Sequence, residues 1–391
     1  MINPFYQRAR KCTATALRLK YSAYYDSFDK QAGSRVWQDG KEMIMLSSND
    51  YLGLTHHPRV VEAAQKALEQ WGASSTGARL ANGSRSYHEA LEEKLADFLG
   101  VEACHITISG YTGCMSAICG FAQRGDLVLA DKNIHSSLWS GIALSGAKLE
   151  RFSHNNPADL EEALAHESKD IAKMLVIEGI YSMEGHICPL PDFLEVARKH
   201  NCFTVLDDAH GLGVLGIEGR GTASHFGLSS KSLDITCGSF SKSLASTGGF
   251  IAGDQYLIEY MKSHARPAIF SAALSPAQVA AASTALDILQ EEPEHLQKLW
   301  ENVDRYNAIL QDLKLDTWES QTPAIPIVLG SKDRAYFFWK ALKEKGIFTI
   351  ISVAPGVPPG KDLIRTAISA RHTDEDFEKI EEALRYASKK I

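Results

Sequence analysis

Lys242 and Asp207 are the two residues whose chemistry is most informative. Each follows an apolar, strand-like run: residues 203–206 precede Asp207, and residues 233–236 precede Ser239 and Lys242. Ligands of open α/β sheets bind beyond the carboxyl ends of the strands. A lysine there can form a Schiff base with an aldehyde, and an aspartate can keep a pyridine nitrogen protonated, which suits pyridoxal 5'-phosphate. Taken alone, the pair also fits a surface lysine and an unrelated strand-end aspartate.

Other groups that could contact such a cofactor also follow predicted strands. The imidazole of His135 could stack on a flat ring, and His210 could hydrogen-bond the phenolic oxygen, with the hydroxyl of Ser182 beside it. Arg365 lies among apolar residues, and a guanidinium binds a carboxylate in a bidentate manner. Each has a plainer alternative: a structural histidine, a turn serine or a structural ion pair.

Two further features suit a phosphate group. The small residues of Ser109–Gly113 form a strand-to-helix turn, whose N–H groups and helix dipole favour an anion, although an ordinary turn is the alternative. Ser239 precedes Lys242 by one expected helical turn, so its hydroxyl would face the phosphate while the lysine faces the aldehyde. The segment Gly211–Gly216 matches GxGxxG, but glycines and a charged turn follow it, which predicts a loop rather than a nicotinamide or flavin site.

Alternating strand-like and helix-like segments from about residue 45 to 275 must position these groups. This alternation predicts an α/β fold, with a mostly parallel sheet between helices. A long helical pattern follows from Pro276, and then a smaller α+β segment with strands near 324–329 and 347–352. We therefore expect three regions: an N-terminal arm (1–45), a large domain (46–280) and a small C-terminal domain (281–391).

Composition excludes several classes of protein. The net charge of −7 argues against a broad nucleic-acid interface. The seven cysteines form no CxxC pair, which predicts reduced thiols in a cytoplasmic protein and no metal site. No apolar run reaches the roughly 18 residues of a membrane span. The basic N-terminus favours a helical arm and leaves open a weak membrane-surface contact; before Asp26 it carries Arg8, Arg10, Lys11, Arg18 and Lys20.

From about Ser47 to the C-terminus the chain resembles the α-oxoamine synthases, pyridoxal-phosphate enzymes of fold type I. The similarity is carried by seven segments in the family's order: SSNDYLGL (47–54), TGARLANGS…HEALEEKLADFLG (76–100), SGYTG (109–113), EGIYSMEGHICPL (178–190), LDDAHGLGVLGIEGRG (206–221), SFSKSLASTGGFIAG (239–253) and VPPGKDLIRTAISARHT (357–373). The resemblance implies a seven-stranded, mostly parallel sheet in the large domain, and a homodimer with active sites at the subunit interface.

The resemblance also implies a role for individual residues. Lys242 resembles the Schiff-base lysine, Asp207 the partner of the pyridine nitrogen, and His135 the stacking residue of the catalytic set. The remaining cofactor contacts implied are Ser182, His210, Gly110, Tyr111 and Ser239, and the implied binders of the amino-acid carboxylate are Asn49 and Arg365. Where many members carry hydroxyls that reach the partner's phosphate, this chain has Ala272 and Ala273, which leaves Ser271 as the candidate for that contact.

The implied reaction is a decarboxylative condensation of a small amino acid with an acyl-CoA, giving an α-amino ketone, CoA and CO₂. Within the family, the segments 239–253 and 265–274 favour a serine palmitoyltransferase-like member. The 8-amino-7-oxononanoate synthases, 2-amino-3-ketobutyrate CoA ligases and α-hydroxyketone autoinducer synthases remain alternatives. Two alternatives lie outside this family's activity. An aminotransferase would use the same lysine and aspartate, whereas a non-catalytic partner subunit would be expected to lack Lys242.

Overall fold

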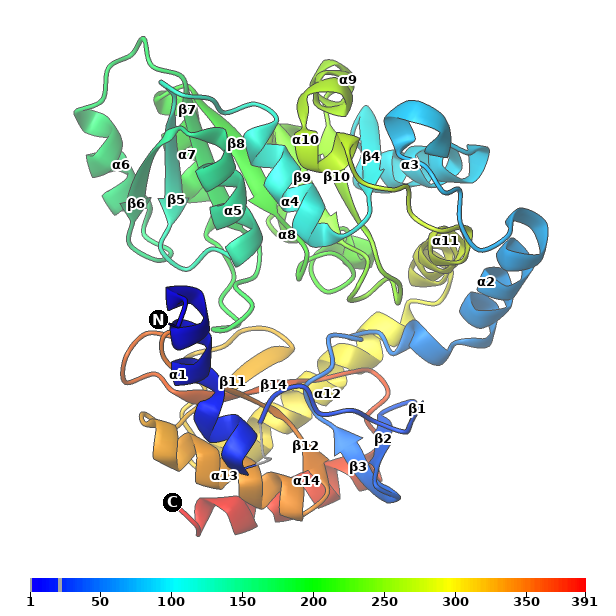
Figure 1. The fold of residues 1–391 in the computed structure, drawn as a ribbon, viewed down its shortest axis with the longest axis vertical. Coiled ribbons are helices and arrows are strands. Elements are labelled where there is room, and N and C mark those ends of the chain that lie inside the picture. The colour runs from blue at the N-terminus through cyan, green and yellow to red at the C-terminus, as the bar shows by residue number, and fades with distance from the viewer. Residues whose placement is uncertain (1, 20–22) are drawn as a thin grey trace.

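The computed structural model describes residues 2–19 and 23–391, with side chains at 2–11 and 23–391. Two layered parts are stacked along the long axis of the molecule (Figure 1). The upper part surrounds a seven-stranded sheet, and the lower part contains both ends of the chain. The predicted α/β fold with a mostly parallel seven-stranded sheet is confirmed.

The large sheet is parallel except at one strand. Its order is β4-β10-β9-β8-β7-β5-β6, and β10 runs antiparallel to both of its neighbours. Strands β5, β7, β9 and β10 are buried along their whole length, since helices cover both faces, which explains their continuous apolar runs. The strands are β4 (Ala103–Thr107), β5 (Leu127–Asp131), β6 (Lys148–Phe152), β7 (Lys173–Glu178), β8 (Cys202–Asp207), β9 (Ile235–Ser239) and β10 (Gly249–Gly253).

The carboxyl ends of the inner strands bring polar residues together. Asp131 ends β5, Glu178 ends β7, Asp207 ends β8 and Ser239 ends β9. The helices that surround this sheet are α4 (Gly110–Cys119), α5 (Ser136–Ser145), α6 (Pro157–Ala165), α7 (Leu190–Lys199), α8 (Thr222–His225), α9 (Gln255–His264) and α10 (Arg266–Ile269). Because parallel strands end at the same edge, these four polar residues lie along one edge of the sheet, where open α/β sheets bind ligands.

The lower part contains two small sheets. One has the order β11-β14-β13, and the other β1-β2-β3-β12, in which β3 runs parallel to β12. Residues 30–45, assigned above to an N-terminal arm, thus contribute three strands that pair with the C-terminal part. The strands are β1 (Lys30–Ala32), β2 (Arg35–Gln38), β3 (Lys41–Met45), β11 (Ala324–Val328), β12 (Ile347–Phe348), β13 (Ile350–Ser352) and β14 (Leu363–Ala367); helices α12 (Glu294–Asp312), α13 (Lys332–Glu344) and α14 (Asp374–Ser388) pack with them.

Helices α2 (Pro58–Trp71), α3 (Ser86–Leu99) and α11 (Pro276–Glu291) lie at one side of the large sheet (Figure 1). The domain boundary proposed near residue 280 falls inside α11, which leads through a short turn into α12. At the N-terminus, α1 (Pro4–Leu19) includes Arg8, Arg10 and Lys11, whereas Lys20 lies outside the described residues. In the described chain, none of the helices combines the length and apolar character that crossing a bilayer requires.

Candidate active site

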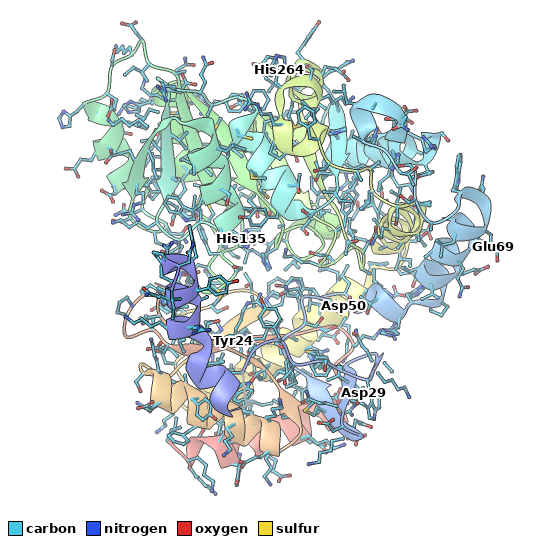
Figure 2. All side chains as sticks on the ribbon, in the orientation of Figure 1. Tyr24, Asp29, Asp50, Glu69, His135 and His264 are labelled. Carbon is cyan, nitrogen blue, oxygen red and sulfur yellow. The ribbon has the colours of Figure 1, made fainter. Side chains whose placement is uncertain are left out.

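A cavity of about 270 Å³ lies beyond the carboxyl ends of the large sheet's inner strands. It brings together residues from α4, α5, β8 and the β9–β10 connection. Its walls include seven residues that the sequence predicted for the cofactor site, namely Gly110, Tyr111, His135, Asp207, His210, Ser239 and Lys242. His135 lies where the two parts of the molecule face each other (Figure 2), and it lines both this cavity and an adjacent one.

Asp207 is held at the inner wall of the cavity. The residue is 5% exposed, and its Oδ1 accepts a hydrogen bond of 3.0 Å from the amide of Ala209. Its Oδ2 accepts one of 3.1 Å from the thiol of Cys114 on α4. A hydrogen bond with Cys237, together with burial, raises the pKa of Cys114, so the thiol stays protonated and remains a donor. Asp207 therefore presents an oriented carboxylate to the cavity.

Lys242 lies in the connection between β9 and β10, and burial lowers the pKa of its amine. No described residue forms a hydrogen bond or ion pair with its Nζ. The prediction that one helical turn separates Ser239 from Lys242 is wrong. Ser239 ends β9, and the amide of Ser241 donates to its Oγ at 3.2 Å, so the chain reverses toward the antiparallel strand β10 instead of continuing as a helix. Both side chains nevertheless line the cavity.

The wall formed by the start of α4 has the features of an anion site. Ser109 caps the helix through its Oγ, which accepts from the amide of Thr112 at 3.1 Å. The amides of Gly110 and Tyr111 belong to the first turn, where no carbonyl within the helix can accept from them. A Cβ at Gly110 would lie 2.5 Å from the Cβ of Ser239, so only glycine lets the helix approach β9 this closely. The first turn of α4 and the hydroxyl of Ser239 thus line the same cavity, and such groups suit a phosphate.

His135 is fixed from two sides. Its amide donates to the carboxyl of Glu178, and its Nδ1 lies 2.8 Å from the Oγ of Ser137. Burial lowers the pKa of His135 and, with the charge of Asp207, raises that of Glu178 well above its usual range. The imidazole is therefore a neutral, flat group on the cavity wall, as a ring-stacking role requires. The sequence analysis missed Glu178, although it ends a buried strand in the EGIYSMEGH segment.

Arg365 and Asn49, the two predicted carboxylate binders, contact each other. Arg365 lies on β14 and is 7% exposed; its Nη2 donates to Asn49 Oδ1 at 2.9 Å and its Nε to the carbonyl of Ser182 at 2.8 Å. Within the described part of the chain, no carboxylate forms an ion pair with this guanidinium. A buried cation without an anionic partner is costly, which makes an anionic ligand favourable here.

Tyr51 connects this pair to the cavity, a link that the sequence did not reveal. Its hydroxyl lies 2.8 Å from Nδ1 of His210 and 3.5 Å from Asn49 Oδ1. Burial lowers the pKa of His210 well below its usual value, so the ring is neutral and can exchange one hydrogen bond with the phenol. Tyr51 belongs to the SSNDYLGL segment, and its position two residues after Asn49 was the only available signal.

Ser182 and Ser271 do not line this cavity. Ser182 lines an adjacent cavity of about 680 Å³, which also contacts His135 and the 354–359 segment. The hydroxyl of Ser271 donates to the carbonyl of Pro267 at 2.6 Å, within the same turn of chain. The predicted contacts of these two serines with the cofactor therefore remain proposals, and that of Ser271 concerns a second subunit.

Comparisons with known proteins agree with this geometry. A family model for class I and II aminotransferases matches residues 41–384. A serine palmitoyltransferase from Sphingobacterium spiritivorum is 40% identical over 362 residues, which are 93% of this chain and 90% of that protein. The 8-amino-7-oxononanoate synthase 1 of Bacillus velezensis is 39% identical over 363 residues, 93% of each chain.

Solved structures show the same relationship. The serine palmitoyltransferase of Sphingomonas wittichii superposes with a TM-score of 0.93 at 31% identity, over 99% of this chain and 97% of that one. An SPT described with a PLP internal aldimine superposes with a TM-score of 0.95 at 29% identity, over 99% of both chains. The chain therefore belongs to the class I and II aminotransferase family and, within it, to the α-oxoamine synthases, which are pyridoxal-phosphate-dependent acyltransferases.

Proposed function

We propose that this enzyme condenses a small amino acid with an acyl-CoA, releasing CoA and CO₂, and that it does so at the cavity around Lys242. The observation that carries the proposal is the state of the Lys242 amine. It is half-buried, no described residue forms a hydrogen bond or ion pair with it, and it lines the same cavity as the oriented carboxylate of Asp207. An amine that is partly removed from water and has no partner is unfavourable unless a ligand engages it.

The residues present fit pyridoxal 5'-phosphate. When bound, this cofactor supplies an aldehyde for covalent attachment of an amine and an electron-withdrawing ring that stabilises a carbanion. Lys242 would hold the aldehyde carbon, and Asp207 would hold the proton on the ring nitrogen. The phosphate would lie on the first turn of α4, at Gly110 and Tyr111, with the hydroxyl of Ser239. His135 would lie against the ring face, and His210, oriented by Tyr51, would donate to the phenolic oxygen.

The amino-acid substrate would be oriented by its carboxylate. Arg365 is a buried cation that has no anionic partner among the described residues, and its Nη2 donates to Asn49 Oδ1 at 2.9 Å. Arg365 approaches from β14 in the lower part, whereas Lys242 belongs to the upper part. A substrate that contacts both would bridge the two parts, so its Cα would be placed between them.

Once the substrate amine has replaced it at the aldehyde carbon, the free amine of Lys242 would be suited to proton transfer at the substrate Cα. Burial lowers the pKa of this amine, so a larger fraction is neutral near physiological pH and able to accept a proton. Burial lowers the pKa of His135 and of His210, so both imidazoles are weaker bases than usual and compete less for that proton. An acyl-CoA thioester would then react with the resulting carbanion, and loss of CO₂ and return of the proton to Cα would give the α-amino ketone.

Among amino acids we propose serine, with alanine and glycine as the alternatives. The support is the 40% identity to a serine palmitoyltransferase and the superposition of serine palmitoyltransferase structures over 97–99% of their own chains. The 8-amino-7-oxononanoate synthase alternative is kept because one such relative is 39% identical. Titrating the cofactor's absorbance with serine, alanine and glycine tests the choice: serine should give the tightest saturable change, and tighter binding of alanine would favour the alternative.

We also propose a homodimer, in which Ser271 contributes to the partner's phosphate site. Large apolar side chains are exposed near this segment: Phe270 is 83% and Leu80 63% exposed. Patches of exposed apolar side chains are typical of interaction surfaces. Light scattering should give twice the mass of one chain, and Phe270→Asp should shift the mass toward that of a monomer.

A further inference from the structure

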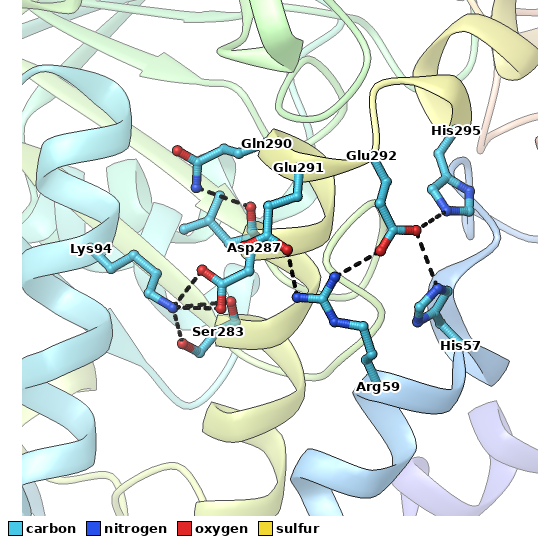
Figure 3. Close-up of polar contacts among 10 residues, drawn as sticks. His57, Arg59, Lys94, Ser283, Asp287, Gln290, Glu291, Glu292 and His295 are labelled. Carbon is cyan, nitrogen blue, oxygen red and sulfur yellow. Dashed lines mark hydrogen bonds and ion pairs between the residues drawn. The ribbon is translucent and has the colours of Figure 1, made fainter.

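His57 meets Glu292 and His295, which lie far from it in the sequence, where α2 begins and the chain turns from α11 into α12 (Figure 3). His57 is the residue that precedes α2, Glu292 is the residue that follows α11, and His295 lies in the first turn of α12. Nε2 of His57 lies 3.5 Å from Glu292 Oε2, and Nε2 of His295 lies 3.3 Å from the same oxygen. We propose that these three residues form a binding site for a divalent transition-metal cation, zinc being the best match.

The distances fit a metal better than hydrogen bonds. A charge-assisted N–H···O bond is usually about 2.7–2.9 Å long, so both contacts are too long to be strong hydrogen bonds. Ligands that each lie about 2.0–2.1 Å from a tetrahedral zinc ion are roughly 3.3–3.4 Å apart. The two measured separations, 3.5 and 3.3 Å, are close to that edge length, and all three ligand atoms lie within 4.8 Å of one another.

The glutamate is oriented for this role by Arg59. One guanidinium nitrogen lies 2.7 Å from Glu292 Oε1, and the other lies 2.6 Å from Glu291 Oε2 (Figure 3). Oε1 is thereby engaged, while Oε2 points to the two imidazoles. The charge of Arg59 opposes a cation, so we expect weaker binding than at a closed four-ligand site. Carboxylates that bind metals are commonly held by such hydrogen bonds.

The three side chains are partly exposed, so water can serve as a fourth ligand. The side chains of His57, Glu292 and His295 are 15%, 26% and 20% exposed, so solvent reaches the site. Two imidazoles and one carboxylate, with water in the fourth position, form a donor set that zinc uses in proteins. Imidazole also suits Co²⁺ and Ni²⁺, whereas Mg²⁺ and Ca²⁺ prefer oxygen ligands.

A bound cation would link the two parts of the molecule where the chain passes from one to the other. It would connect the start of α2, which follows the segment with Asn49 and Tyr51, to the turn between α11 and α12. A ligand that binds the folded state alone raises its stability according to concentration and affinity. The sequence predicted no metal site because His57 and His295 belong to no motif of metal-binding spacing; only the fold brings them together.

The test uses full-length, untagged enzyme with its cofactor, treated with a chelator and dialysed. Equilibrium dialysis against Zn²⁺ should show about one bound ion per chain. Bound zinc should also raise the Tm of the enzyme. His295→Ala should weaken zinc binding by at least about tenfold. His56→Ala removes the neighbouring, exposed histidine and should bind zinc as the wild type does, which controls for histidine content.

Cobalt gives an independent readout. Co²⁺ in a tetrahedral site with nitrogen ligands absorbs strongly in the visible, and this band should form in the wild type and in His56→Ala but not in His57→Ala or His295→Ala. Wild-type enzyme that binds no zinc, or a His295→Ala variant that binds it equally well, would overturn the proposal. If either alanine variant does not fold, His295→Gln, which keeps a polar side chain of similar length, replaces it.

Discussion

The thiol of Cys114 lies 3.1 Å from Oδ2 of Asp207, so a helix on one face of the sheet orients a carboxylate at the end of a central strand. Asp207 also accepts from the amide of Ala209, and these two donors fix the plane of the carboxylate. A thiol is a weak donor that leaves the carboxylate free to hold a second, stronger partner. This arrangement suits an aspartate whose main partner is a protonated ring nitrogen.

Cys114→Ala should destabilise the cofactor-free protein by about 1–3 kcal/mol, because a buried carboxylate loses one of its two donors. Urea unfolding of the apoprotein measures the change. Cys119→Ala removes another thiol of the same helix, one that does not contact Asp207. This variant should lower the free energy of unfolding by less than Cys114→Ala does. Equal losses in the two variants would show that the hydrogen bond to Asp207 contributes nothing.

Asp207→Asn should retain the cofactor but lower turnover by at least about a hundredfold, because the charge that stabilises a protonated ring nitrogen matters most as the carbanion forms. Cofactor content by absorbance and kcat by CoA release separate binding from catalysis. Near-normal kcat with full cofactor content would assign the ring nitrogen to another partner.

Arg365→Ala should weaken amino-acid binding by about 2–4 kcal/mol, the scale for truncating one partner of a desolvated charge pair. Arg365→Lys should restore only part of the affinity, since an ammonium cannot reproduce the bidentate contact. Titrating the cofactor's absorbance with the amino acid gives both values, and the KM for acyl-CoA serves as the control. Unchanged amino-acid affinity in Arg365→Ala would place the carboxylate elsewhere.

Glu92 should make the free energy of unfolding depend on pH. This carboxylate on α3 accepts from Arg79 at 2.8 and 3.0 Å and from the amide of Ile106 at 2.9 Å, and His105 Nδ1 lies 2.9 Å away. Burial alone would raise its pKa, but His105 and Arg79 outweigh burial and lower the pKa from 4.5 to about 2. A carboxyl with a depressed folded-state pKa stabilises the protein above its unfolded pKa and loses that contribution as the pH falls.

The contribution of Glu92 should be about 3 kcal/mol above pH 4.5, fading as the pH falls toward about 2. Glu92→Gln should abolish this pH dependence and destabilise the fold near neutrality by about 3–5 kcal/mol, because Arg79 is left buried without its partner. Urea unfolding across the acid range measures both effects. Glu89→Gln, an exposed position on the same helix, should leave the pH profile as in the wild type; a Glu92→Gln profile identical to that of Glu89→Gln would contradict the assignment.

The parts of the fold that the sequence predicted are those with continuous apolar runs. The sequence has apolar runs at 127–130, 174–177 and 203–206, which predict strands, and the structure has β5, β7 and β8 there, since helices on both faces of the sheet require apolar side chains. Strand β6 was missed: Lys148–Phe152 is an edge strand in which three of the five residues are charged and only Phe152 is buried. The run at 347–352 was predicted as one strand, yet it divides into β12 and β13, which join different sheets.

The candidate site was predictable where chemistry follows a strand end, as at Asp207, or a glycine-rich turn, as at Gly110. Contacts that depend on how segments distant in the sequence pack together were not predictable. The donor that Cys114 provides to Asp207 depends on the rotation of α4, and the contact of Tyr51 with His210 joins residues far apart in the chain. The prediction of a helical turn between Ser239 and Lys242 was wrong because the antiparallel strand β10 follows, which requires the chain to reverse its direction.

The proposed condensation is tested by measuring the CoA and CO₂ that the wild-type enzyme and Lys242→Ala release from serine, alanine or glycine with acyl-CoA thioesters of increasing length. We predict CoA and CO₂ in equal amounts with one amino acid of this set, and loss of both products in Lys242→Ala, together with loss of the borohydride-sensitive visible absorbance. Amino-group transfer to a keto acid without release of CoA, or product formation in Lys242→Ala at the wild-type rate, would contradict the account.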